Sequence, residues 1–140
     1  MIETIHANCV AIGGRGVLIA GASGSGKSDL ALRLIDRGAR LLSDDYSVLR
    51  RAGDRLVASA PATIAGRIEV RGVGIVEMDA IAEAPVCLLV DLDAVPDRLP
   101  GPRTADFLGV GVPAIGLAAL EASAPIKVEA ALRRFGLTIP

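Results

Sequence analysis

The 140-residue sequence is poor in aromatic side chains: two Phe, one Tyr and no Trp make up 2% of the chain. Proteins that bind single-stranded nucleic acid stack bases on aromatic rings and present an excess of positive charge. Here 15 basic and 16 acidic residues are scattered along the chain and give a formal net charge of −1. The shortage of aromatic side chains and the lack of an excess of positive charge both predict a protein that does not bind nucleic acid.

Long apolar runs are missing as well. No run approaches the ~20 residues that a membrane-spanning helix needs, and the N-terminus has no basic segment followed by a long apolar stretch. We therefore expect no membrane association and a cytoplasmic location. The only two cysteines, Cys9 and Cys87, lie far apart in apolar segments, so we interpret them as buried free thiols rather than a disulfide or a metal framework.

One segment has a strong functional pattern. Residues 21–28, Gly-Ala-Ser-Gly-Ser-Gly-Lys-Ser, match G-x-x-x-x-G-K-[ST] at every fixed position. In such a phosphate-binding loop (P-loop), backbone N–H groups surround the phosphates, the lysine reaches the β- and γ-phosphates, and the hydroxyl binds Mg²⁺. The predicted nucleotide-binding residues are Gly21, Ala22, Ser23, Gly24, Ser25, Gly26, Lys27 and Ser28.

The segments around the P-loop fit this interpretation, because an apolar strand precedes it and helical periodicity follows it. With 51% hydrophobic residues, the chain is long enough for one α/β domain with an aliphatic core. The predicted strands or extended segments are Thr4–Ile12, Val17–Ala20, Arg40–Asp45, Tyr46–Arg50, Arg55–Ser59, Ile68–Val76 and Pro85–Asp93, with the last strands within Ala105–Leu120. The predicted helices are Ser28–Arg37, capped by a left-handed Gly38, and an amphipathic closing helix from about Pro125 to Phe135, ended by Gly136.

Carboxylates lie at the ends of two predicted strands. Asp44 and Asp45 end one, and Asp91 lies near the end of another. Ligands of open α/β sheets bind beyond the carboxyl ends of strands, so the pattern leaves both groups open as the metal-binding acids. Because successive side chains of a strand point to opposite faces, we expect Asp44 and Asp45 to have different roles unless the chain bends there.

Three further features are ambiguous when read alone. His6, the only histidine, fits an ordinary strand histidine near a sheet end. Glu69 and Arg71 share one face of an extended segment whose nearby glycines indicate a close approach of backbone or ligand. Arg98 lies in the proline-rich loop 95–103, either as a surface charge or as a group that stabilises a transferring phosphate.

Three segments together carry a specific resemblance. They read IHANCVAIGGRGVLIAGASGSGKS, RGARLLSDD and IEVRGVGIVEM. The sequence resembles the catalytic, C-terminal domain of bacterial HPr kinase/phosphorylase, strongly over residues 4–78 and loosely beyond, and the third segment resembles the family's glutamate-x-arginine-glycine-x-glycine signature. The resemblance implies a mixed β-sheet with flanking helices, of the HPr kinase/phosphoenolpyruvate carboxykinase type. It also implies ATP- and Mg²⁺-dependent phosphorylation of a serine of HPr.

The resemblance further implies a role for individual residues. It favours Asp44 and Asp45 over Asp91 as the functional acids, with Asp45 as the general base toward the serine hydroxyl. The remaining matches are His6 as the active-site histidine, Lys27 as the phosphate-binding lysine, Ser28 and Glu69 as the magnesium ligands, and Arg98 as the catalytic loop arginine.

The sequence also departs from the common family pattern. Common members have a separate N-terminal domain, whereas this chain begins almost at the catalytic domain, so we expect one catalytic domain over residues 1–140, similar to the short form of the family. The family's proline-valine-lysine-x-glycine-arginine stretch, tied to dephosphorylation, has no counterpart in Gly116–Ile126. The kinase reaction is therefore predicted, and the reverse phosphorylase reaction is not supported.

The resemblance implies two kinds of partner. One is an HPr-like phosphocarrier of a bacterial phosphotransferase system, and the other is further copies of the chain, since the family forms hexamers. Two alternative functions stay open. One is a P-loop phosphotransferase acting on a small molecule, and the other is a nucleotide-binding regulatory module that transfers no phosphate.

Overall fold

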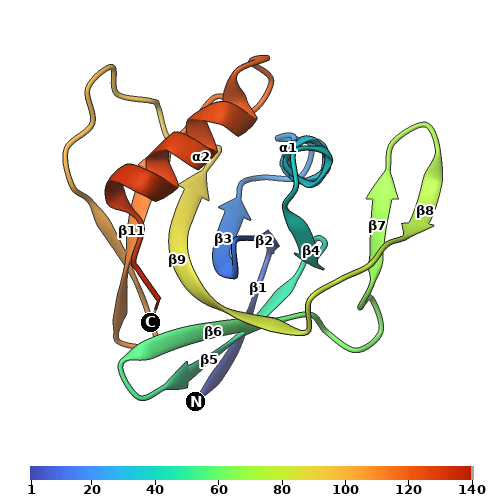
Figure 1. Cartoon of the computed structure of the whole chain (residues 1–140), viewed down its shortest axis with the longest axis horizontal. Helices are drawn as coiled ribbons and strands as arrows, with labels where there is room; N and C mark the ends of the chain where they lie inside the picture. Colours follow the sequence, from blue (N-terminus) through green and yellow to red (C-terminus); the bar gives the residue numbers. More distant parts are fainter. Residues whose placement is uncertain (140) are drawn as a thin grey trace.

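A computed structural model describes residues 1–139, and a curled sheet of nine strands runs through it (Figure 1). Seven strands follow the order β1-β5-β6-β9-β3-β2-β4, and β11 pairs with both β9 and β10. The strands are β1 (Ile2–Ile5), β2 (Ala7–Ile12), β3 (Arg15–Ala20), β4 (Arg40–Ser43), β5 (Ser47–Ala52), β6 (Arg55–Ser59), β9 (Glu83–Asp91), β10 (Thr104–Phe107) and β11 (Val110–Gly116). A separate hairpin consists of β7 (Arg67–Val70) and β8 (Gly74–Glu77), and the helices are α1 (Lys27–Asp36) and α2 (Ala124–Phe135).

The sheet is mixed because β9 pairs differently along its length. Its first residues pair antiparallel with β6, and its later residues pair parallel with β3 and β11. On the other side of β3, β2 runs antiparallel to both β3 and β4. A mixed sheet with flanking helices is the fold class that the sequence predicts, and this prediction is confirmed.

The core has one layer on each face of the sheet. Because side chains alternate along a strand, Val17 and Ile19 of β3 pack in the layer with α1 and α2, while Leu18 packs in the layer with β5, β6 and β11. All three side chains are fully buried, and burial of each contributes about 1.5–3 kcal/mol. The strand that leads into the P-loop is therefore held firmly from both sides.

Helix α1 follows the P-loop directly and buries Leu30, Ala31 and Leu34 on one face. Its C-terminus is capped by Gly38, which has a left-handed φ of 111°. The N–H of Ala39 donates to the carbonyl of Leu34 at 3.0 Å. The N–H of Gly38 donates to the carbonyl of Ile35, also at 3.0 Å. This double hydrogen bond is the Schellman cap, so the predicted helix and its cap are confirmed.

Helix α2 lies beside α1 on the same face of the sheet (Figure 1). It buries Val128 and Leu132, as the amphipathic pattern predicts, and Gly136 follows it in an extended conformation. Arg37, which caps α1, pairs with Glu129 of α2 at 2.7 Å. Neither helix among the described residues is long and apolar enough to cross a membrane.

Two predicted extended segments are wrong in detail. The segment Thr4–Ile12 is broken by a bend at His6, because β1 pairs with β5 whereas β2 pairs with β3 and β4. The segment Ile68–Val76 is a hairpin, because Gly72 and Gly74 adopt positive φ values of 85° and 119° and reverse the chain. Arg71 therefore lies in the turn and not on a strand face shared with Glu69. The last strands, β10 and β11, lie within the predicted segment Ala105–Leu120 except for Thr104, the first residue of β10.

Candidate active site

A cleft of about 770 Å³ opens between the P-loop, the end of β4 and the β7–β8 hairpin. Since β3 and β4 both run antiparallel to β2 between them, their carboxyl ends meet at the same edge of the sheet. This is where ligands of α/β sheets bind. The cleft is lined by Ser23, Gly24, Gly26, Lys27, Ser28, Asp29, Leu32, Asp44, Asp45, Glu69, Val70, Arg71 and Leu120.

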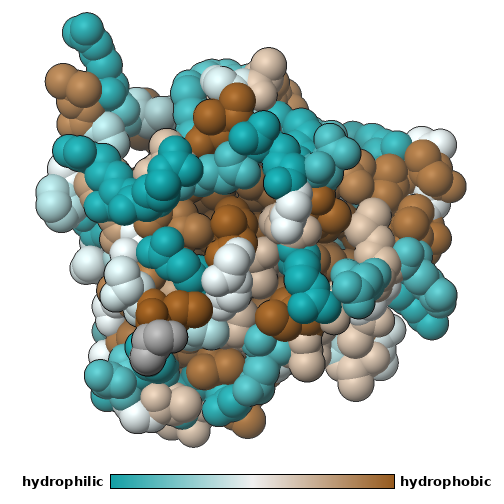
Figure 2. Space-filling view, in the orientation of Figure 1, coloured by the Kyte–Doolittle hydropathy of each residue, from teal (hydrophilic) through white to brown (hydrophobic). Residues whose placement is uncertain are grey.

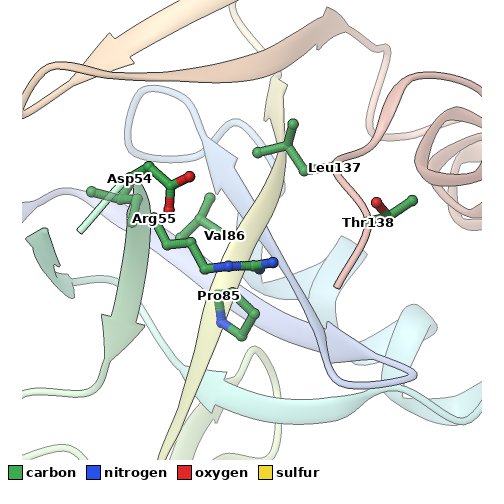
Figure 3. A pocket seen from close by; sticks show the side chains of 7 residues that line it. Asp54, Arg55, Pro85, Val86, Leu137 and Thr138 are labelled. Atoms are coloured by element: carbon green, nitrogen blue, oxygen red, sulfur yellow. The ribbon is translucent and has the colours of Figure 1, made fainter. Parts of the chain in front are cut away.

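A second pocket, of about 220 Å³, lies near the beginning of β9, away from this edge (Figure 3). Pro85 and Val86 of β9 form its floor, the Arg55 side chain crosses it, and Leu137 and Thr138 of the C-terminal segment lie opposite. It contains none of the predicted site residues, so the larger cleft is the candidate active site.

The P-loop has the backbone geometry of a phosphate cradle. Gly24 and Gly26 have φ values of 82° and 98°, a region that side-chain-bearing residues rarely adopt. Gly26 is also the N-cap of α1, and Gly26, Lys27 and Ser28 line the cleft, so the free N–H groups at the start of the helix favour an anion there. Lys27 is only 6% exposed and its ammonium donates to the carbonyls of Gly21 and Ala22, at 2.9 and 3.1 Å.

The P-loop packs closely around the Ser25 side chain. A Cβ at Gly21 would lie 2.5 Å from the Ser25 hydroxyl oxygen and 3.1 Å from the Cβ of Leu92, so a larger residue would have to displace the Ser25 side chain. The Ser25 hydroxyl is itself buried and has no hydrogen-bond partner within residues 1–139. Buried hydroxyls are normally paired, so an acceptor brought by a ligand would satisfy this one.

Asp44 is a buried carboxylate with three hydrogen bonds. Its Oδ1 accepts from the Ser28 hydroxyl at 2.7 Å and from the side-chain amide of Asn8 at 2.6 Å. Its Oδ2 accepts from the backbone N–H of Glu69 at 2.9 Å. Burying a charge is costly unless donors compensate it, and here three elements of the fold supply them. Asp44 thereby joins the P-loop, β2 and β7.

Asp45 has different partners. Its side chain is 56% exposed, and its Oδ1 lies 2.8 Å from Nε2 of His6. The ring of Tyr46 lies 5.1 Å from the ring of His6. The backbone bends at Asp45, whose φ is 66°, and its N–H donates to the side-chain oxygen of Asn8 at 3.1 Å. The two adjacent acids therefore lie in different environments within one cleft.

The oxygen donors in the cleft fit a magnesium ion that arrives with a nucleotide. The Ser28 hydroxyl, the Asp44 carboxylate and Glu69 all line the cleft. Mg²⁺ is usually bound by one or two carboxylates together with substrate phosphates and water, and these donors match that set. In residues 1–139 no group of three His, Cys, Asp or Glu side chains that could hold a metal by itself occurs.

Six residues singled out from the sequence are not among those that line the cleft: His6, Gly21, Ala22, Ser25, Asp91 and Arg98. His6 contacts Asp45, which does line it. Arg98 is exposed on the segment between β9 and β10 and is not among the lining residues. Asp91, the rival acid, accepts a hydrogen bond from the N–H of Asp93 at 2.9 Å. Asp93 in turn accepts from the N–H of Ala22 at 3.2 Å. The segment that follows β9 therefore contacts the P-loop through Asp93. The sequence did not point to this residue.

Asn8 is the other residue that the sequence reasoning missed. It is fully buried in β2, and its side chain contacts both Asp44 and Asp45. Two signals point to it in the sequence. Asparagine is unusual inside an apolar strand, and Asn8 lies two residues after His6, where strand side chains share a face.

Comparison with known proteins supports the same interpretation. The model of the HPr serine kinase C-terminal domain matches residues 2–84, which is more than half of the chain. The chain belongs to this family. The matched range contains His6, the P-loop, Asp44, Asp45 and Glu69. Arg98 lies outside it. The resemblance seen in the three sequence segments is thus confirmed.

Relatives and a solved structure extend the match. HPr kinase/phosphorylase of Caldanaerobacter subterraneus subsp. tengcongensis is 48% identical over 79 residues, 56% of this chain and 26% of that protein. The protein of the same name from Chlorobium phaeobacteroides is 38% identical over 131 residues, 82% of this chain and 38% of that protein. The chain thus spans between about a quarter and two fifths of these two relatives.

A match to a solved structure extends over nearly the whole chain. The structure of the HPr(Ser) kinase/phosphatase from Coxiella burnetii superposes with a TM-score of 0.81 and 32% identity. The match covers 94% of this chain and 95% of that one. The HPr kinase fold therefore includes the region after residue 84, where the family model ends.

Proposed function

We propose that this member of the HPr kinase family transfers the γ-phosphoryl group of ATP to a serine of an HPr-like phosphocarrier of a bacterial phosphotransferase system. The observation that carries the proposal is the meeting, in one cleft, of a P-loop lysine, a serine hydroxyl and two aspartates with different partners. The relatives named HPr kinase/phosphorylase support the acceptor class.

ATP supplies the phosphoryl group when bound, and Mg²⁺ neutralises part of its charge. The backbone N–H groups of residues 21–28 and the Lys27 ammonium bind the phosphates. Ser28 and Glu69 hold the metal ion. The Asp44 carboxylate accepts a hydrogen bond from the Ser28 hydroxyl and adds a negative charge beside the metal ion. Support for these roles comes from the shared cleft and from the positive end of α1, which favours phosphate.

Asp45 acts as the general base that accepts the proton of the acceptor serine. Its carboxylate is more exposed than that of Asp44 and lines the cleft, so an incoming hydroxyl can reach it. His6 holds that carboxylate in place through the 2.8 Å contact. Phosphoryl transfer depends mainly on positioning and charge neutralisation, which these residues provide. We also propose that Arg98, which is exposed on the loop between β9 and β10, adds positive charge at the transferred group, as the resemblance to the family implies.

The rim of the cleft supports a protein acceptor. Val73 and Ile75 of the β7–β8 hairpin are 74% and 66% exposed, and Figure 2 shows apolar surface over this hairpin. Leu120, which lines the cleft beside the P-loop, is 82% exposed. Exposed apolar side chains beside a polar cleft are typical of a surface that docks another protein.

Labelled ATP tests the proposal directly. The protein is incubated with the label, Mg²⁺ and an HPr-like carrier, beside the same carrier with its target serine changed to alanine. We expect label on the intact carrier only. No label on either carrier overturns the proposal. ATP turnover that depends on a small molecule then favours a small-molecule phosphotransferase, and binding without turnover favours a regulatory module.

We also propose that residues 1–140 form one P-loop catalytic domain that assembles into a homo-oligomer, a hexamer by resemblance, in the cytoplasm. Light scattering of the purified protein measures the mass of the assembly, and a monomer at micromolar concentration contradicts the oligomer.

The kinase reaction is the proposed direction. Phosphate release from a serine-phosphorylated carrier, followed in the same assay, tests the reverse reaction.

A further inference from the structure

Asn8 is the only carboxamide side chain in the protein, because the sequence contains one Asn and no Gln. It is fully buried in β2 among the apolar residues Ala7, Cys9 and Val10. An aliphatic residue would be the cheaper choice at such a position, since a buried amide must have all its hydrogen bonds satisfied. The polar partners of Asn8 are all in the candidate active site.

We propose that Asn8 is a positioning residue that gives Asp44 and Asp45 their separate roles. The inference rests on the proposed phosphoryl transfer and adds a residue to it. Through its nitrogen, Asn8 turns Asp44 toward the magnesium-binding hydroxyl of Ser28. Through its oxygen, it holds the backbone bend that turns Asp45 toward His6.

The nitrogen side of the amide sets the direction of Asp44. Nδ2 donates to Oδ1 of Asp44 at 2.6 Å and approaches the Ser28 hydroxyl oxygen at 3.3 Å. The same Oδ1 accepts from the Ser28 hydroxyl at 2.7 Å. The side chains of Asn8, Ser28 and Asp44 thus contact one another in a closed triangle. An ionised carboxylate only accepts hydrogen bonds, so a side chain with an N–H group is needed at the position of Asn8. Asn8 therefore fixes the spacing between Asp44 and the hydroxyl that holds the metal ion.

The oxygen side of the amide sets the direction of Asp45. Oδ1 of Asn8 accepts the N–H of Asp45 at 3.1 Å. Asp45 has a φ of 66°, a left-handed conformation that side-chain-bearing residues adopt at a cost. In a regular strand, adjacent residues would point to opposite faces of the sheet. The bend that Asn8 holds instead brings both acids to the cleft.

Asn8→Asp and Asn8→Ala test the proposal, with Ser47→Ala as the matched control. Ser47 is also fully buried and polar, but its hydroxyl donates to the Ala7 carbonyl and touches neither acid. We expect both Asn8 variants to need about 10- to 100-fold more Mg²⁺ for half-maximal transfer, the range typical of residues that orient metal ligands. Ser47→Ala leaves the magnesium requirement unchanged.

The magnesium requirement separates positioning from a structural role. A variant that only loosens the fold lowers the free energy of unfolding, but its folded molecules need no more Mg²⁺ than the wild type. A variant that misplaces the Asp44 carboxylate raises the Mg²⁺ concentration for half-maximal transfer. Folded Asn8 variants with a wild-type magnesium requirement overturn the proposal.

A measurement on the unchanged protein covers the case in which the variants do not fold. The side-chain NH₂ group of Asn8 gives the only carboxamide pair in a ¹H–¹⁵N spectrum, because no other Asn or Gln exists in the chain. We expect this pair to shift when Mg²⁺ and a non-hydrolysable ATP analogue are added.

A pair that stays within its linewidth when Mg²⁺ and the analogue are added overturns the role of Asn8. This readout needs no carrier and no turnover, so it is independent of the proposed function. If the pair shifts but the wild-type protein labels no carrier, the proposed acceptor is wrong and the positioning role stands. If carrier is labelled and the pair does not move, the positioning role alone is wrong.

Discussion

Nε2 of His6 lies 2.8 Å from Oδ1 of Asp45, although 39 residues separate them in the sequence. His6 occupies the bend between β1 and β2, and Asp45 follows β4, which pairs with β2. Both side chains are partly exposed, and exposed ion pairs contribute little to stability. The contact therefore matters for the direction of the Asp45 carboxylate more than for the fold.

Removal of either partner is expected to reduce transfer without unfolding the protein. We expect His6→Ala and Asp45→Asn each to lower kcat for carrier phosphorylation by about 100-fold, the usual size of a general-base contribution. Because the two act as a unit, the double variant is expected to be no slower than the slower single variant. Asp54→Asn, in the turn between β5 and β6, serves as the control. If the double variant loses kcat by the product of the two single losses, His6 and Asp45 act independently and the pairing is wrong.

Lys27→Met is expected to weaken nucleotide binding by about 10- to 100-fold, because charged hydrogen bonds to phosphate contribute about 1.5–3 kcal/mol. The sequence contains only one other lysine, Lys127, which pairs with Glu121 at the start of α2. Lys127→Met removes the same charge at an exposed position and is the matched control. Calorimetric titration with an ATP analogue and Mg²⁺ measures both. Equal affinities for the two variants contradict the role of Lys27.

The local elements were predictable because their causes are local. The apolar spacing of Leu30, Ala31 and Leu34 defines α1, and Gly38 marks its end, since only a residue tolerant of positive φ fits the cap. The P-loop was likewise visible in the sequence, because its glycines must turn the backbone around an anion. Patterns of this kind depend only on neighbouring residues.

The missed features depend on pairing between distant segments. The break at His6 exists because β1 and β2 join different partners, and residues 68–76 contain no signal that separates an extended segment from a hairpin except the glycines themselves. Asn8 was overlooked because its partners lie 36 and 37 residues away. The position of Asp44 and Asp45 beside the P-loop was predictable only through the general rule for strand ends.

The cap of α1 gives a test of the fold that is independent of function. Gly38→Ala has room for its methyl group, but the φ of 111° is unfavourable for alanine. We expect a loss of about 1–2 kcal/mol in the free energy of unfolding, measured by urea titration. Gly101→Ala, at an open loop position without positive φ, is the matched control and is expected to change stability little. Equal stabilities for both variants contradict the cap.

The last prediction concerns pH and the Cys9 thiol. Burial raises the pKa of Cys9 from 9.0 to about 12. Between these two values the folded protein keeps the thiol proton and the unfolded chain loses it. The unfolded state therefore binds fewer protons, and the free energy of unfolding falls as the pH rises through this window. Below about pH 9 the contribution is fully present.

Cys9→Ala removes this dependence, although it lowers stability at neutral pH by leaving a small cavity. Urea titrations of both proteins from about pH 8 to about pH 10.5 measure the difference. We expect the wild-type advantage over Cys9→Ala to shrink steadily above pH 9, because only the wild type loses stability through this thiol. In the folded wild type, a thiol reagent at about pH 8 is expected to leave Cys9 unmodified, since the thiolate is the reactive form. A constant difference across the titration, together with rapid labelling of Cys9, contradicts the buried, protonated thiol.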